Sequence, residues 1–167
     1  IRGGSERIVD EAERSVKDAL NVVRDVIIEP KILAGGGAPE AELARRLRRF
    51  ADTLTGKERL AVSAFADAVE AIPVTLAENA GMDPVDTVSE LRSRHEAGEV
   101  WAGVDVYECK VRDMREIDVY EPLLVKKQVI KSATEAAVML LKIDDVIAAA
   151  KVKPPKEAEK GEEETEF

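Results

Sequence analysis

Apolar residues recur at intervals of three and four along the first thirty residues, which is the pattern of one stripe on an amphipathic helix. Ser5 is suited to cap the start of this helix, and acidic residues follow in the first turns, where the helix dipole favours negative charge. Pro30 ends the pattern, so the sequence predicts a helix of about 22 residues from Ser5. The predicted apolar stripe contains Ile8, Ala12, Val16, Ala19, Leu20, Val23 and Ile27.

Three further helices are predicted between residues 39 and 98, each bounded by glycine or proline. The second runs from Pro39 to about Thr55, and the fourth from Asp83-Pro84 to near Gly98. The third starts near Lys57 and meets Pro73, which should kink it or end it before a last turn that closes at Gly81. The expected buried residues are Leu43, Leu47, Phe50 and Leu54 on the second helix, and Leu60, Ala61, Ala64, Phe65, Ala68, Val69 and Ile72 on the third.

Residues 100–114 change to a β-branched and aromatic composition, which favours a small β hairpin. A long helix resumes at Pro122. Its segment 136–141 is apolar on every side, so we expect a central core helix enclosed by the others. Beyond Ala150, a Glu/Lys-rich run without periodicity predicts a solvated, disordered tail. The predicted fold class is mainly α, a helical bundle with a small hairpin.

Length and composition narrow the class of protein. With 167 residues, 45% of them hydrophobic and 35% charged, the chain suits one soluble domain, or one domain with an appendage. No apolar run approaches the roughly 18 residues of a membrane span, and the start lacks a secretory layout, so we expect a cytoplasmic protein without membrane contact. The net charge of -9 disfavours nucleic acid as a partner. One cysteine and one histidine exclude an internal disulfide and a four-ligand zinc site.

Few residues suggest chemistry on pattern alone. Gly35, Gly36 and Gly37 precede a helix N-terminus, where backbone N–H groups and the helix dipole favour an anion. The run lacks the Lys-Ser/Thr ending of a P-loop, so a tight turn between helices remains an alternative. Asp18 lies opposite the first apolar stripe, as an ordinary solvated carboxylate would. His95 and Cys109 lack the partners of a catalytic nucleophile, and we expect both to be structural.

A series of motifs resembles the group II chaperonins, the archaeal thermosome and its eukaryotic cytosolic relatives, in the same order over residues 1 to 150. The motifs are Gly3-Gly4-Ser5-Glu6, Asp10-Glu11-Ala12-Glu13-Arg14-Ser15, Asp18-Ala19-Leu20, Ala34-Gly35-Gly36-Gly37-Ala38-Pro39-Glu40, Ala77-Glu78-Asn79-Ala80-Gly81-Met82-Asp83-Pro84, Trp101-Ala102-Gly103-Val104-Asp105-Val106, Glu121-Pro122-Leu123, Ile130-Lys131-Ser132-Ala133-Thr134-Glu135-Ala136-Ala137 and Ile143-Asp144-Asp145-Val146-Ile147. One departure is Cys109, which stands in the hairpin turn where that family usually has glycine.

The resemblance implies a domain organisation. Residues 1–33 would be the C-terminal part of an intermediate domain, residues 34–150 the C-terminal half of an equatorial ATP-binding domain, and residues 151–167 the acidic tail. It also implies the site: Gly35, Gly36 and Gly37 close to the nucleotide, Gly103, Val104 and Asp105 beside the adenine, and Glu121 facing the ribose hydroxyls. Asp18 would be the catalytic carboxylate that orients or activates water. The implied cofactor is ATP with magnesium, whose ligands are expected mainly outside this chain, so we assign no metal ligand here.

The whole family member would hydrolyse ATP as a homo- or hetero-oligomeric double ring that encloses unfolded protein clients. The clients would bind through an apical domain that has no counterpart in this chain. The family's N-terminal equatorial half, with its phosphate loop, is also missing, so we expect these residues alone to bind ATP weakly and not to turn it over. The alternative hypothesis is an acidic helical scaffold that assembles with partners and binds no nucleotide.

Overall fold

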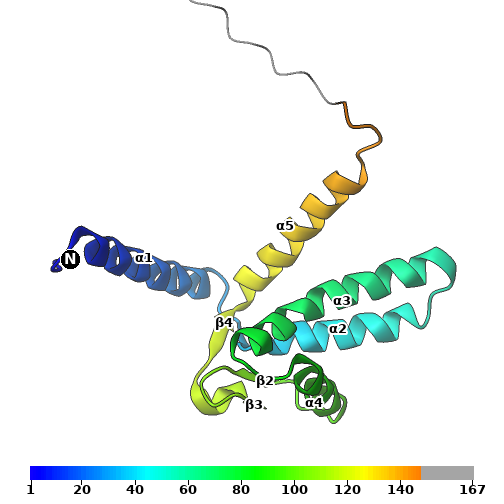
Figure 1. Ribbon diagram of the computed structural model, residues 1–167, viewed down its shortest axis with the longest axis horizontal. Helices are drawn as coiled ribbons and strands as arrows, with labels where there is room; N and C mark the ends of the chain where they lie inside the picture. Colours follow the sequence, from blue (N-terminus) through cyan, green and yellow to red (C-terminus); the bar gives the residue numbers. More distant parts are fainter. Residues whose placement is uncertain (148–167) are drawn as a thin grey trace, which may run out of the picture.

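The computed structural model describes residues 1–147 (Figure 1). The predicted tail, residues 151–167, lies outside the described residues, as do residues 148–150. In chain order the elements are α1 (Glu6–Ile28), β1 (Ile32–Ala34), α2 (Ala38–Ala51), α3 (Gly56–Asn79), α4 (Pro84–Glu96), β2 (Ala102–Asp105), β3 (Lys110–Asp113), the 3-10 helix η1 (Met114–Ile117), β4 (Tyr120–Pro122) and α5 (Leu123–Leu141). The mainly helical class and the hairpin are confirmed, and Ser5 caps α1 as predicted, accepting a hydrogen bond from the Ile8 N–H.

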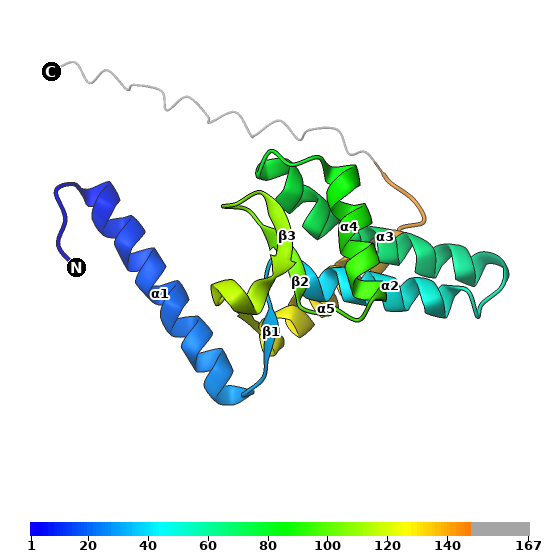
Figure 2. The same cartoon turned by 90° about the horizontal axis from the view of Figure 1, so that it is seen from below.

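Helices α2 and α3 lie side by side in both views and form the main helical layer, with α4 against them (Figures 1 and 2). Small side chains fill this contact, so the two backbones approach closely. The buried apolar residues of the two helices include Ala41, Ala44 and Ala51 of α2 and Ala66, Val69, Pro73 and Ala77 of α3, whereas Ala38 of α2 packs with Ala34 and Met114.

The predicted buried face of α3 is therefore largely wrong, whereas of the residues predicted for the second helix Leu43, Leu47 and Leu54 are half-buried and only Phe50 is exposed. Phe50 is 55% exposed and Leu60 is 71% exposed, and of the predicted α3 stripe only Val69 is buried. The prediction placed the largest apolar residues inside, whereas a close helix pair buries alanines and turns the larger residues outward. Pro73 does not end α3 early, because the helix continues through it to Asn79.

The prediction that the last helix is a central, enclosed core helix is also wrong among the described residues. α5 has no buried residue, and its last apolar residue, Leu141, is 85% exposed. Figure 1 shows α5 extending away from the helical layer, with its first turns beside β4. The apolar perimeter of 136–141 does suit an enclosed helix, but the elements that would enclose it are not among the described residues. The apolar stripe of α1 is likewise exposed at Ile8, Leu20 and Ile27.

Two short antiparallel sheets organise the rest. β2 pairs with β3 in the predicted hairpin, with Val104 opposite Val111. β1 pairs with β4, with Leu33 opposite Glu121. The second pairing is absent from the sequence prediction, because two three-residue strands so far apart in sequence carry too short a pattern. The expected domain boundary between residues 33 and 34 falls inside β1.

A charged cluster joins the three helices of the layer. Glu70 of α3 is nearly buried, and its carboxylate accepts hydrogen bonds from Arg48 of α2 at 3.0 and 2.5 Å and from Arg92 of α4 at 2.8 and 2.5 Å. Burial opposes ionisation of Glu70, but Arg92 and Arg48 outweigh it and lower the pKa of this carboxyl to about 2. By length and composition, α3 is also the one described helix that could cross a membrane. In this fold α3 packs against α2 and α4 and supplies Glu70 to the ion cluster.

Replacing Glu70 should reveal how much this cluster stabilises the fold. We expect Glu70→Gln to lower the free energy of unfolding by about 2 kcal/mol at pH 7, less than for a fully buried pair because Arg92 is half exposed. The folded-state pKa is depressed, so the contribution is complete above about pH 4.5 and is lost as the pH falls toward 2. Urea denaturation followed by circular dichroism should therefore show the wild-type advantage shrinking over that range. Asp67→Asn, which removes an exposed partner of the same Arg48, should change stability by less than about 0.5 kcal/mol.

Cys109 tests the cost of the hairpin turn. Its φ is +51°, a left-handed conformation that favours glycine, as the departure at this position predicts. We expect Cys109→Gly to raise the free energy of unfolding by about 1 kcal/mol relative to Cys109→Ala, because alanine keeps the Cβ and its strain. Equal stabilities of the two variants would show that the turn carries no such strain.

Candidate nucleotide-binding site

The glycine loop, residues Gly35–Gly37, leads from β1 directly into α2. Gly36 and Gly37 have φ values of +63° and +74°, which glycine adopts without strain. Gly37 occupies the N-cap position of α2, and Gly35 N–H donates to the Val119 carbonyl at 2.9 Å. Neither Gly36 N–H nor Gly37 N–H donates to an acceptor among the residues that the structure describes. These two amides and the N-terminal end of α2 together provide donors suited to an anion.

The loop and strand β2 meet backbone to backbone. Val104 N–H donates to the Gly36 carbonyl at 2.8 Å. A Cβ on Gly103 would lie 2.8 Å from the Gly35 carbonyl oxygen and 3.0 Å from that of Gly36, and a Cβ on Gly36 would lie 2.8 Å from the Val104 carbonyl oxygen. Side chains are therefore excluded on both sides of the contact. The structure brings together the glycines, Gly103 and Val104, which lie some 70 residues apart in sequence.

Glu121 lies at the same place, on β4. A Cβ on Gly35 would lie 3.5 Å from Glu121 Oε1, so one carboxylate oxygen borders the loop. The other oxygen, Oε2, pairs with the ammonium of Lys126 at 2.6 Å. The predicted ribose residue is thus beside the predicted phosphate loop.

The carboxylate of Asp105 serves the hairpin. It is buried and accepts hydrogen bonds from Tyr107 N–H at 2.9 Å and Glu108 N–H at 3.2 Å, with Arg112 at 3.6 Å. Burial opposes its ionisation, but the two amides and Arg112 outweigh this and lower the pKa of Asp105. Its role beside an adenine stays a prediction. In the structure its side chain stabilises the hairpin turn through these hydrogen bonds.

Asp18 does not join this group. It is exposed near the middle of α1, a helix that stands away from the layer in Figure 2 and contacts the rest chiefly through β4 and α5. The described part of the chain offers Asp18 no hydrogen bond or ion pair. A catalytic role therefore requires α1 to approach the glycine loop.

His95 is structural, as its lack of catalytic partners predicts. It is buried between α4, α2 and β2. It is 1% exposed, with Nδ1 at 3.2 Å from Glu42 Oε2 and Nε2 at 2.9 Å from the Ala102 carbonyl. It thus connects α4 to α2 and to the first residue of β2. Hydrogen bonds from Arg45, Arg46 and His95 lower the pKa of Glu42 to about 2 despite its burial. The partly buried Trp101 packs against Ala34, Ala38 and Met114 and so anchors the start of the hairpin.

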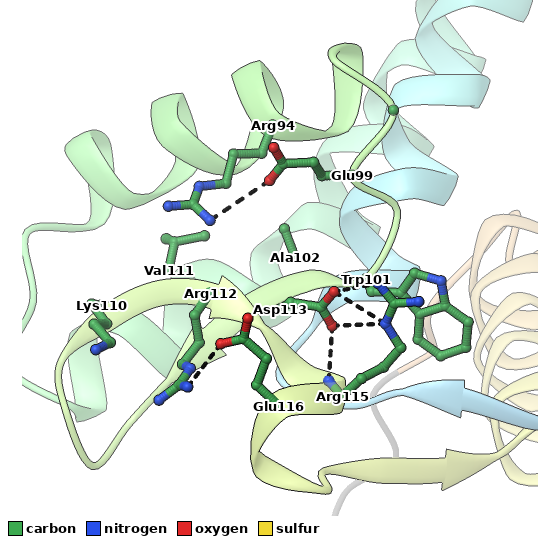
Figure 3. Close-up of a pocket in the computed structure, with 11 residues that line it drawn as sticks. Arg94, Glu99, Trp101, Ala102, Lys110, Val111, Arg112, Asp113, Arg115 and Glu116 are labelled. Carbon is green, nitrogen blue, oxygen red and sulfur yellow. Dashed lines mark hydrogen bonds and ion pairs between the residues drawn. The ribbon is translucent and has the colours of Figure 1, made fainter.

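A cavity of about 650 Å³ lies elsewhere, between α4, the hairpin and η1. It is lined by none of Gly35, Gly36, Gly37, Gly103, Val104 or Glu121. Figure 3 shows that its cations face carboxylates: Arg94 faces Glu99, Arg112 faces Glu116, and Arg115 faces Asp113. Arg115 also lies over the Trp101 ring, 4.9 Å from its centroid. These pairings account for the charges without a ligand.

Sequence reasoning missed the ion pair of Lys126 with Glu40, which borders the site. Lys126 belongs to none of the motifs and Glu40 only ends the glycine motif, so the tertiary contact alone makes the pair notable. Within residues 1–147, no group of three His, Cys, Asp or Glu side chains could hold a metal ion.

Comparison with known proteins identifies the family. The model of the TCP-1/cpn60 chaperonin family matches residues 1–151. The chain is 60% identical to a thermosome subunit of Methanopyrus kandleri over 149 residues, which are 89% of this chain and 27% of that protein. It is 53% identical to a thermosome subunit of Pyrococcus horikoshii over 167 residues, 100% of this chain and 30% of that protein.

Among solved structures, the open-state monomer of a group II chaperonin from Methanococcoides burtonii is similar with a TM-score of 0.73 and 54% identity, over 84% of this chain and 35% of that one. The chain belongs to the TCP-1/cpn60 chaperonin family, and it spans less than a third of the length of these curated relatives. The resemblance read from the sequence motifs is confirmed.

Substitution of Gly36 should separate backbone strain from close approach. Gly36 and Gly56 both have positive φ values, +63° and +65°, but only at Gly36 would a Cβ meet other atoms, with Met114 Sδ at 2.6 Å. We expect Gly56→Ala to cost about 1 kcal/mol and Gly36→Ala about 3 kcal/mol in free energy of unfolding, measured by urea denaturation. Equal losses would mean that the loop and hairpin are not held in contact.

Proposed function

We propose that these residues form the C-terminal part of an ATP-dependent chaperonin subunit and supply one half of its nucleotide site. The observation that supports this most directly is the meeting of the glycine loop, β2 and Glu121 at one place, in a chain of this family. Residues 1–33 would belong to the intermediate domain and residues 34–150 to the equatorial domain.

Each part of the site suits one part of ATP. The amides of Gly36 and Gly37 and the N-terminus of α2 suit the phosphates. Gly103 and Val104 would border the adenine, as the family resemblance implies, and Glu121 Oε1 suits a ribose hydroxyl as an acceptor. Magnesium, when bound with ATP, would neutralise developing phosphate charge, and its protein ligands would come mainly from outside residues 1–147.

Asp18 would act after closure of α1. Phosphoryl transfer to water depends on positioning and electrostatics, so a carboxylate that orients the attacking water must reach the γ-phosphate. α1 ends at Ile28 and a short connection leads to β1, so a change near Glu29 and Pro30 would swing the helix as a unit. Closure of this kind would gate turnover.

The exposed apolar faces of α1, α3 and α5 support an incomplete core. Monomeric soluble proteins rarely expose such continuous apolar surface, so we infer that further protein covers these faces. The covering protein would include the remaining equatorial domain of a cytoplasmic, homo- or hetero-oligomeric double ring that encloses unfolded clients. In the alternative hypothesis of a scaffold that binds no nucleotide, partner proteins would also cover these faces. ATP binding and hydrolysis therefore distinguish the two hypotheses.

The proposed role of Asp18 predicts a separation of binding from turnover. In a longer subunit that carries these residues, Asp18→Ala should leave ATP binding within about twofold and lower the phosphate release rate at least about 100-fold. The 167 residues alone should release no phosphate above background, because the rest of the site is absent.

Asp10→Ala is the matched control, because Asp10 is an exposed carboxylate on the same helix. It should retain full turnover. Persistent turnover in Asp18→Ala would contradict the catalytic assignment, and magnesium-dependent hydrolysis by the 167 residues, abolished by Asp18→Ala, would contradict the half-site.

A further inference from the structure

Lys126 lies in the first turn of α5 and is shared by two carboxylates. Its Nζ is 2.6 Å from Glu40 Oε1 and 2.6 Å from Glu121 Oε2, and its side chain is only 16% exposed. Burial opposes the charge of this ammonium, but the bonds to Glu121 and Glu40 outweigh it and raise the pKa of Lys126. The lysine therefore stays charged at neutral pH and holds both carboxylates.

Glu40 anchors this arrangement to the glycine loop. It lies in the first turn of α2, three residues after Gly37, and its side chain is 5% exposed. Its second oxygen, Oε2, has no hydrogen-bond partner among the described residues. A carboxylate buried so deeply depends on its one cation, since an unpaired buried charge is strongly unfavourable.

Glu121 has the most exposed side chain of the three. Its backbone is fixed opposite Leu33 in the β1–β4 pair, but its side chain is one-third exposed. Lys126 holds Oε2, and this leaves Oε1 directed to Gly35, 3.5 Å from the place of a Cβ there. No described residue pairs with Oε1 in the way that Lys126 pairs with Oε2.

We infer that Lys126 is a positioning residue for the nucleotide site: anchored by Glu40, it holds the Glu121 carboxylate so that Oε1 accepts a hydrogen bond from a ribose hydroxyl. This inference rests on the proposed function. It adds that recognition of the sugar depends on a lysine that does not itself touch the nucleotide. The Lys126 ammonium contacts only Oε2 of Glu121, because its other carboxylate partner is Glu40. Oε1 of Glu121 can therefore accept a hydrogen bond from a hydroxyl group.

The test compares ATP with 2′-deoxy-ATP and 3′-deoxy-ATP, titrated into the chain and followed by NMR chemical shifts. For the wild type, we expect at least one deoxy analogue to bind about tenfold more weakly, because a hydrogen bond to a charged acceptor is lost. Lys126→Met should reduce this preference to less than about threefold, whereas Lys126→Arg should retain most of it. A merely structural role would weaken ATP and the analogues alike and leave their ratio unchanged.

Lys126→Met also leaves Glu40 as an unpaired buried charge, which can prevent folding. The double variant Glu40→Gln with Lys126→Met removes that charge and leaves only Glu121 unheld, and it should fold and show the same lost preference. A wild-type preference that survives in this variant overturns the inference alone. ATP binding without any deoxy preference in the wild type overturns it together with the ribose role of Glu121, and no ATP binding at all overturns the proposed function itself.

Discussion

The hydrogen bond from Val104 N–H to the Gly36 carbonyl joins two backbones that approach too closely for side chains. The glycine loop ends β1 and starts α2, and β2 follows α4, so this one contact fixes the end of the helical layer against the hairpin. A Cβ on Gly36 or Gly103 would meet backbone oxygens at 2.8 Å. Two stretches of the chain, the glycine loop and β2, thereby meet main chain against main chain, which only glycine allows at Gly36 and Gly103.

Hydrogen bonds and ion pairs of buried polar side chains reinforce each junction around this contact. Glu70 joins α2, α3 and α4, His95 joins α4 to α2 and β2, and Lys126 joins α5 to α2 and β4. The alanine-lined contact between α2 and α3 buries little apolar area per residue, so directional bonds contribute much of the specificity. The larger apolar residues of α1, α3 and α5 face outward instead, as in a domain whose core is completed by other protein.

The local features of the fold could be predicted from sequence, and the tertiary ones could not. Ser5, Pro39, Asp83 and the glycines mark helix ends through their own backbone preferences, so the helices were correctly placed. Which face of α3 is buried depends on the approach of α2, and the apolar perimeter of α5 indicates a partner that the described residues do not include. The glycine motif indicated an anion site and the family resemblance implied Glu121 beside it, but only the fold pairs Lys126 with Glu40, because no local pattern encodes an ion pair across 86 residues.

The most direct test of the account is to map ATP onto the chain by amide chemical shifts, with and without magnesium. We predict that the perturbed amides cluster at Gly35–Gly37, Gly103–Asp105 and Glu121, and that those of α1 remain unchanged. No perturbation at millimolar ATP would contradict the half-site. Perturbations confined to the cavity of Figure 3, around Arg94, Arg112 and Arg115, would also contradict it, because ATP would then bind away from the glycine loop.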